Sequence, residues 1–247
     1  MYSRLIALAF TGLGLASAQT TSVRVLGSNG VRAVIEELKP QYEQKTGRRL
    51  EIQWGSTTDQ VKKINSGESF DLTILTTEAI DQLAKAGKLM PKTAPVARCG
   101  VGVGIRSGSS KPDIATPEAM KRTLLQAKSI TYAEDGASRA YVEKMMDHFG
   151  ITAQMKPKIM LAHGSVAADA LVADGKAEMV LTLASEILPA PGVTLVGTLP
   201  EQVQGYINFA AGISANAKNA DAAEAFINVI KSSAAKPVYQ AKGMEPR

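Results

Sequence analysis

The sequence is poor in the residues that support metal, redox or nucleic-acid chemistry. It contains one cysteine and two histidines, and aromatic residues make up 5% of the chain. A lone Cys99 excludes an internal disulfide, and no His/Cys/Glu spacing resembles a zinc site, so no metal is expected. The formal net charge is +5, but no basic cluster accompanies it, which disfavours nucleic acid as a partner. No glycine-rich loop matches a nucleotide fingerprint, and no cofactor is expected.

Long hydrophobic runs are also missing, apart from one short run at the N-terminus. Arg4 precedes an apolar stretch from Leu5 to Ala16, and Ala16-Ser17-Ala18 fits an A-x-A cleavage site. The run is too short to cross a bilayer, which favours a signal peptide over residues 1–18 rather than a signal anchor. Because no cysteine stands at the cleavage point, a lipid anchor is not expected. We predict an exported protein.

Strand and helix patterns alternate along most of the remaining chain. This alternation is typical of parallel sheets covered by helices. Apolar residues recur at helical spacing in Val31, Ile35, Leu38 and Tyr42, for example. The expected strands are 23–26, 50–54, 72–75, 101–105, 129–132, 158–161, 179–183, 193–196 and 206–213.

Two segments, 91–95 and 199–205, have the composition of connections rather than of strands or helices. The block between them can form its own sheet, whereas strand 206–213 and helix 221–231 must rejoin the N-terminal part. We therefore expect two lobes joined by two crossing strands. Residues 19–97 and 206–247 form lobe one, and residues 98–205 form lobe two. A ligand is expected in the cleft between the lobes, outside the carboxyl ends of the strands.

Four strands run into clusters of small polar residues that open a helix. These junctions are Gly27-Ser28-Asn29-Gly30, Gly55-Ser56-Thr57-Thr58, Gly136-Ala137-Ser138 and Gly164-Ser165. Each presents free backbone N–H groups at a helix N-terminus, which is how a fold without metals holds an anion. Two junctions fall on each lobe, so the ligand would bridge the cleft. The predicted ligand contacts are Ser28, Asn29, Gly30, Ser56, Thr57, Thr58, Ser138, Ser165 and Val166.

Several stretches in order along the chain carry a resemblance to a known family. They are 23–30 with the helix that follows, 54–58, Ile64-Asn65-Ser66-Gly67, 70–74, Ser165-Val166 and 174–178. Over nearly the whole mature chain, the sequence resembles type II periplasmic solute-binding proteins, above all the periplasmic molybdate-binding branch. The resemblance implies an α/β fold with two lobes, each a mainly parallel sheet flanked by helices. It also implies a periplasmic monomer that binds a small anion and has an ABC transporter permease as partner.

The chain departs from that branch at ligand positions. The serine of the first junction falls on Gly30 or Asn29, Asp59 follows the retained Thr57 and Thr58, and Leu183 replaces a tyrosine after the last strand of lobe two. The resemblance implies that molybdate is held by neutral donors. Because two of these donors are replaced, we expect a different ligand.

Two arginines favour a carboxylate ligand. Arg98 begins the first crossing strand, and Arg139 directly follows the third junction. A planar guanidinium suits bidentate recognition of a carboxylate, so both are predicted ligand contacts. The alternative for each is a solvated surface arginine.

His163 lies directly before the fourth junction and should point toward the mouth of the cleft. Some aconitate isomerases resemble molybdate-binding proteins, and moving a proton between carbons of a tricarboxylate needs a carboxylate clamp and a general base. The first hypothesis is therefore a non-catalytic binding protein of an ABC importer for a small oxyanion or carboxylate. The alternative is an isomerase that interconverts cis- and trans-aconitate, with His163 as base. A third is an exported protein that binds another small polar solute.

Overall fold

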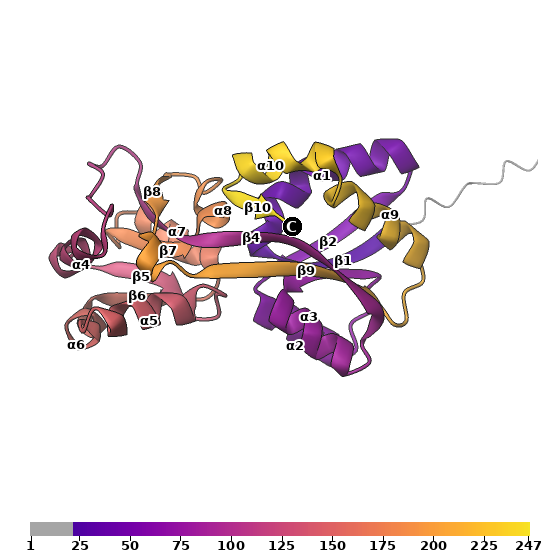
Figure 1. Cartoon of the computed structure of the whole chain (residues 1–247), viewed down its shortest axis with the longest axis horizontal. Helices are drawn as coiled ribbons and strands as arrows, with labels where there is room; N and C mark the ends of the chain where they lie inside the picture. The colour runs from indigo at the N-terminus through magenta and orange to yellow at the C-terminus, as the bar shows by residue number, and fades with distance from the viewer. Residues whose placement is uncertain (1–21) are drawn as a thin grey trace, which may run out of the picture.

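The molecule consists of two lobes connected by two long strands. The computed structural model describes residues 22–247, so the signal peptide expected over residues 1–18 lies outside them. Strands β4 (Leu89–Arg106) and β9 (Tyr206–Ser214) pair antiparallel and run from one lobe into the other (Figure 1). The expected two-lobed α/β fold with two crossing strands is confirmed. Within residues 22–247, no helix has the length and apolar character needed to span a membrane.

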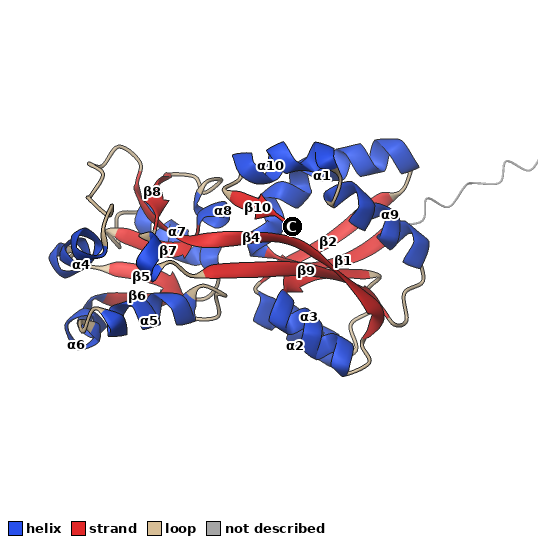
Figure 2. Cartoon of the chain, in the orientation of Figure 1, coloured by secondary structure: helices blue, strands red, loops and turns tan. Residues whose placement is uncertain are grey.

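Lobe one is built on a sheet in which β1 (Ser22–Ser28) pairs in parallel with both β2 (Arg49–Gly55) and β3 (Leu72–Thr76). Strand β9 then runs antiparallel to β3, and β10 (Met244–Pro246) runs antiparallel to β4. Two groups of helices cover this sheet on opposite sides in Figure 2. One group contains α2 (Thr57–Asn65) and α3 (Thr77–Lys85), and the other α1 (Asn29–Thr46), α9 (Ala220–Ile230) and α10 (Lys236–Ala241).

Lobe two is built on β5 (Ile130–Ala133), which pairs in parallel with β6 (Ile159–Ala162) and β7 (Met179–Leu183). The end of β4 pairs antiparallel with β7 and with β8 (Val193–Thr198). Single 3-10 turns lie at Lys156–Lys158, Glu201–Val203 and, in lobe one, Ser233–Ala235. The helices of lobe two are α4 (Pro117–Gln126), α5 (Arg139–His148), α6 (Thr152–Met155), α7 (Ser165–Ala173) and α8 (Ala184–Ile187).

The expectation that residues 91–95 form a connection is wrong, because they lie inside β4. Prolines remove ladder donors and are tolerated at edges and irregularities. Here the β4–β9 register shifts between Leu89 and Thr93 and again between Pro95 and Ala97. Strand β10, only three residues long, was also not expected. β4 exchanges β10 for β7 as its partner after Gly100, and this supports the lobe division that we propose, at residues 97/98 and 205/206.

The apolar faces read from the sequence form the core. Val31, Ile35 and Tyr42 of α1 are fully buried, and the Tyr42 ring meets Phe226 of α9 edge-on at 5.1 Å between centroids. Gly47 ends α1 in the left-handed region, with φ at 66°, where a glycine is favoured. This packing anchors the helix whose N-terminus carries the first junction.

Candidate functional site

All four strand-to-helix junctions meet between the lobes. In lobe one, the Thr57 hydroxyl donates to Ser28 Oγ at 3.4 Å, which joins the first and second junctions. In lobe two, the Gly164 N–H donates to Asp135 Oδ1 at 2.8 Å, which joins the fourth junction to the residue preceding the third. The junctions therefore form one site rather than four separate helix ends.

Two contacts join the lobes directly at this site. The buried Ser185 hydroxyl of α8 donates to the Gly30 carbonyl of α1 at 2.7 Å. His163 Nε2 lies 3.7 Å from Asp59 Oδ2 of α2. The structure thus shows the lobes closed upon one another.

The four helices present different N-termini. Ser28 accepts the N–H of Gly30 at 3.4 Å, and Ser56 accepts the N–H of Asp59 at 3.0 Å. By contrast, α5 and α7 begin at Ser138 and Gly164 without any side-chain cap. First-turn N–H groups have no partner within a helix, and the N-terminus carries positive partial charge. In α5 the N–H groups of Arg139 and Tyr141 already donate to the Gly136 and Ser138 carbonyls, so the start of α7 is the better source of donors for an anion.

Two cavities open where the junctions meet. The first, of about 380 Å³, has Thr57 and Thr58 on one side and Asp135, Gly136 and Ala137 on the other. The second, of about 580 Å³, lies between α1 and the helices α7 and α8. Its polar lining residues include Asn29, Arg32, Ser165, Asp169 and Glu186. Each cavity is lined by both lobes, as expected of a ligand that bridges them.

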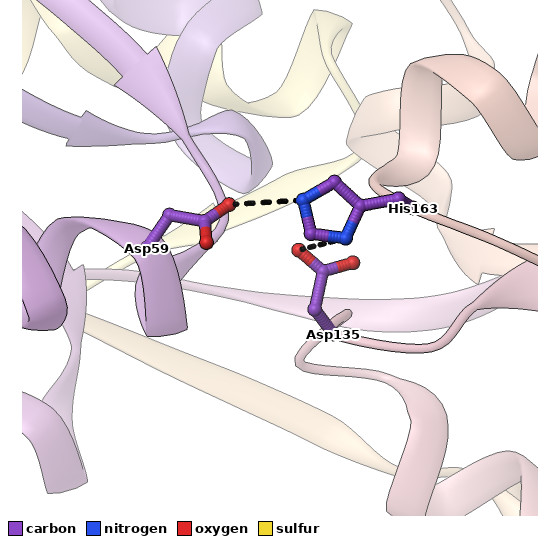
Figure 3. Close-up of side chains that lie close together, drawn as sticks. All are labelled: Asp59, Asp135 and His163. Atoms are coloured by element: carbon purple, nitrogen blue, oxygen red, sulfur yellow. Dashed lines mark ion pairs between the residues drawn. The ribbon is translucent and has the colours of Figure 1, made fainter.

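His163 lies among three carboxylates at the first cavity. Its Nδ1 is 3.4 Å from Glu134 Oε1 and 3.9 Å from Asp135 Oδ2, while Asp59 approaches Nε2. Figure 3 shows Asp59 reaching the ring from lobe one and Asp135 from lobe two. Two-thirds of the His163 side chain is exposed, so the ring sits at the mouth of the cleft, as predicted.

Asp135 is ionised in this setting. Burial by itself would raise the pKa of its carboxyl, but the hydrogen bond from the Gly164 N–H and the nearby Ser56 hydroxyl outweigh burial, and the pKa is lower than usual. Its Oδ2 is buried and has no hydrogen-bond partner. The site therefore holds a negative charge with one unused acceptor.

Two carboxyl groups that line the second cavity, those of Asp169 and Glu186, have raised rather than lowered pKa values. Burial, with the nearby Glu186, raises the pKa of Asp169 to about 8, and the side chain is buried. Burial also raises the pKa of Glu186, although hydrogen bonds from Thr182, Ser165 and the Leu183 N–H act against it. A neutral carboxyl can donate a hydrogen bond, so Asp169 does not repel an anion as an ionised carboxylate would.

The model of the family of bacterial extracellular solute-binding proteins matches residues 23–245 of the chain. The chain belongs to this family. It is 28% identical to an aconitate isomerase of a Pseudomonas species over 261 aligned positions, covering 100% of the chain and 98% of that protein. It is 24% identical to the molybdate-binding protein ModA of Azotobacter vinelandii, covering 98% of the chain and 96% of that protein. The solved structure of the Azotobacter vinelandii periplasmic molybdate-binding protein superposes with a TM-score of 0.73 and 19% identity, covering 90% of this chain and 98% of that one.

Most of the predicted ligand residues of this solute-binding protein lie at the cleft between the lobes. Thr57 and Thr58 line the first cavity, and Asn29, Ser165 and Val166 line the second. The others lie at the helix starts just beside them: Ser28 and Ser56 cap α1 and α2, Gly30 follows in α1, and Ser138 precedes α5. That these residues contact a ligand stays a prediction.

Close packing explains why residue 30 is a glycine. A side-chain carbon at this position would lie 2.5 Å from Phe209 Cζ and 2.8 Å from Leu183 Cδ1. Leu183 is itself buried, and it contributes no hydroxyl. This part of the site is therefore an apolar wall against the first helix.

The two predicted arginines have partners within the chain. Arg98 Nη2 is 2.7 Å from Glu245 Oε2, and its guanidinium lies 4.2 Å from the centre of the Tyr206 ring. Arg98 pairs with Asn208, whereas the neighbouring Ile207 lines the first cavity, so Arg98 points from the opposite face of the β4–β9 ribbon. This position does not support a ligand contact by Arg98.

Arg139 remains close to the third junction. Its Nε is 2.8 Å from Glu143 Oε1, one helical turn further along α5, and Nη1 donates to the Glu134 carbonyl at 2.9 Å. The side chain is 41% exposed, and turning toward a ligand would break these bonds. A ligand contact by Arg139 stays a prediction.

Sequence reasoning missed several residues of the site. Asp135 directly precedes Gly136 at the third junction, so the same reasoning about polar residues at strand ends could have predicted it. Ser185, Glu186 and Asp169 gave no signal, because they follow no glycine cluster and reach the site only through the packing of α7 and α8 against α1.

Proposed function

We propose that this protein captures a small carboxylate anion between its lobes in the periplasm and delivers it to an ABC importer. The observation that carries the proposal is the meeting of four helix N-termini, two from each lobe. Backbone N–H groups and hydroxyls at such ends stabilise anions without a full positive charge. Closure of the lobes around the ligand is the hinge motion typical of such binding proteins.

The form of the second cavity favours a carboxylate over a compact oxyanion. The cavity is lined by Ala33, Ala170, Ala190 and Pro189 in addition to its polar groups. A carbon skeleton can pack against these walls, whereas a tetrahedral oxyanion cannot use them.

Thermal unfolding of the mature, metal-free protein with molybdate, sulfate, phosphate, citrate, cis-aconitate and trans-aconitate tests the proposal. A ligand that binds only the folded state raises the midpoint, by an amount that grows with its concentration over Kd. We expect the largest shifts with the tricarboxylates. A shift with molybdate alone would refute the carboxylate assignment.

A matched pair of variants locates the site. Thr57→Val removes a hydroxyl that lines the first cavity and keeps the side-chain shape. We expect about a tenfold loss of affinity, or roughly 1.4 kcal/mol, typical of a lost hydrogen bond to a charged group. Thr198→Val makes the same change at an exposed position at the end of β8 and should leave affinity unchanged.

The second candidate function is isomerisation of aconitate. It is favoured by the full-length similarity to an aconitate isomerase and by a histidine in the cleft that faces three carboxylates. His163 would take a proton from the methylene carbon, the double bond would shift, and the proton would return to the former alkene carbon. A general base of this kind must reach the carbon acid within the closed cleft.

The ultraviolet absorbance of cis-aconitate mixed with purified protein tests this candidate. Conversion that is lost in His163→Ala, while the thermal shift with aconitate persists, would support it. His148→Ala is the matched control, because His148 ends α5 and is exposed. Absence of conversion by the unmodified protein would leave the binding function alone.

A further inference from the structure

We propose that Asp59, Asp135 and His163 form a binding site for a divalent transition-metal ion, best matched by Zn²⁺, that fastens the two lobes together. One ligand atom from each of these residues lies within 4.8 Å of the others. Imidazole nitrogen and carboxylate oxygen are ligands that Zn²⁺ takes in tetrahedral sites. The proposal does not rest on the function proposed above.

The imidazole must turn to complete the site, because Asp59 lies near Nε2 whereas Asp135 and Glu134 lie near Nδ1, and an ion takes only one of the two nitrogens. Ligand atoms around a tetrahedral zinc ion lie about 3.3 Å apart, given metal–ligand distances near 2.0–2.1 Å. Side chains of His163 and Asp59 are 66% and 32% exposed, so both can rotate toward a common centre. Asp135, at 10% exposure, is held in place by its bond from Gly164. It forms the fixed side of the site.

An independent observation points to a missing partner. Asp135 Oδ2 is buried, faces His163 and accepts no hydrogen bond. A buried charged oxygen without a partner is costly, and a coordinated cation removes this cost. Glu134, with Oε1 3.4 Å from the same imidazole nitrogen, is available as a fourth ligand.

Charge in the closed cleft also requires a cation. Closure brings Asp59 of lobe one to the Glu134 and Asp135 side of lobe two, with His163 between them. The only other cation that pairs with this group among residues 22–247 is Lys62, 3.9 Å from Asp59 and largely exposed. Three carboxylates around one imidazole leave a net negative charge that a divalent ion reduces.

The position of the ligands gives the ion a mechanical role. Asp59 belongs to α2 in lobe one, whereas Asp135 and His163 follow strands β5 and β6 of lobe two. An ion can be bound by all three residues only when the lobes are closed. Its binding should therefore shift the equilibrium toward the closed form.

Titration of the intact mature protein with Zn²⁺, in buffer free of carboxylates and after removal of bound metal, tests the proposal. We expect one ion per chain, a higher unfolding midpoint, and at least tenfold weaker binding in both His163→Ala and Asp59→Asn. His148→Ala and Asp81→Asn, which change exposed residues of the same types, should bind as the unmodified protein does. Co²⁺ in place of Zn²⁺ should give the intense visible absorption of a tetrahedral site.

Unaltered Zn²⁺ affinity in His163→Ala, or no stoichiometric binding by the unmodified protein, would overturn the proposal. Both variants change partly exposed side chains, so their folding can be verified separately by circular dichroism. The anion series uses metal-free protein, and this titration contains no anion ligand. Either proposal can therefore fail while the other stands.

Discussion

At the scale of single residues, Asp169 makes stability depend on pH. Its pKa is about 8 in the folded protein and near 3.9 in an unfolded chain. The folded state therefore binds the extra proton between these values, and this contribution to stability falls as pH rises from about 4 to about 8. Above pH 8 no further loss is expected.

Asp169→Asn should remove this dependence. Urea unfolding at pH 5 and pH 9 is expected to show the unmodified protein losing about 1–4 kcal/mol relative to the variant over this interval. Asp81→Asn, on the exposed face of α3, serves as the control and should follow the unmodified protein. Parallel pH curves for the unmodified protein and Asp169→Asn would contradict the assignment.

Gly30 provides a second residue-scale prediction. Gly30→Ala places a methyl group 2.5 Å from Phe209 Cζ and 2.8 Å from Leu183 Cδ1, so the closed form must rearrange. Overpacking of this kind costs about 1–3 kcal/mol, measurable by chemical unfolding. Gly197→Ala meets its nearest neighbour, Ile114 Cδ1, at 3.6 Å and should be close to neutral. Equal costs at both positions would show that the contact is easily relieved.

The places of individual residues in the fold were predictable from the sequence where a local pattern marked them. Ser28 and Ser56 cap helices after a strand, and both were found from the small polar residues at those positions. Asp59, Asp135 and His163 come from three separate segments, and no spacing along the chain connects them. For this reason the sequence predicted no metal site, although all three residues lie beside predicted junctions.

At the scale of helices and strands, the contact between α1 and α8 should control closure. Ser185→Ala removes the hydroxyl that donates to the Gly30 carbonyl and leaves that carbonyl unpaired when the lobes close. In an open form, water can satisfy it, so the cost of about 1–3 kcal/mol falls on the closed form. We expect anion affinity to weaken about tenfold in isothermal titration calorimetry.

Ser233→Ala is the control for this variant, because Ser233 is exposed and begins a 3-10 turn. If Ser185→Ala binds the anion as tightly as the control, the contact does not contribute to closure. The test is independent of which anion is used.

Most strands and helices followed from local pattern, since apolar periodicity and glycine stops are properties of short segments. The first half of β4 did not, because its prolines indicate a break, whereas its second half was expected as strand 101–105. Around them β4 pairs with β9, whereas β10 pairs only with Ala97, Cys99 and the residue between them. The strand forms because it pairs with segments far along the chain, and its own residues do not predict this pairing.

At the scale of the whole molecule, the lobes should open when the cleft is empty. Closure is held by the bond from Ser185 to Gly30, by the packing of Leu183 against α1 and by the approach of His163 to Asp59, while β4 and β9 form a continuous connection. Few contacts of this kind hold two lobes only weakly, and a ligand that touches both adds its binding energy to the closed form alone. The conformational equilibrium is thus expected to depend on the ligand.

Distance measurements between spin labels test this dependence. The exposed positions Ser66, at the end of α2, and Lys144, in α5, lie on different lobes, and Cys99 is buried, so added cysteines at these positions can be labelled selectively. We expect a broad distribution of longer distances without ligand and a narrower, shorter one with saturating tricarboxylate. Labels at Ser66 and Asp81, both in lobe one, should show no change.

The same distance measurement can test closure by Zn²⁺ separately from closure by the anion. If Asp59, Asp135 and His163 hold the ion across the cleft, Zn²⁺ alone should shorten the distance between the labels, and His163→Ala should abolish this effect but not the effect of the anion. Thr57→Val should weaken the response to the anion and leave the response to Zn²⁺ intact. If calorimetry shows that a ligand binds and the distance does not change, the lobes do not move on binding, and affinity is set by side chains within the cleft rather than by hinge motion.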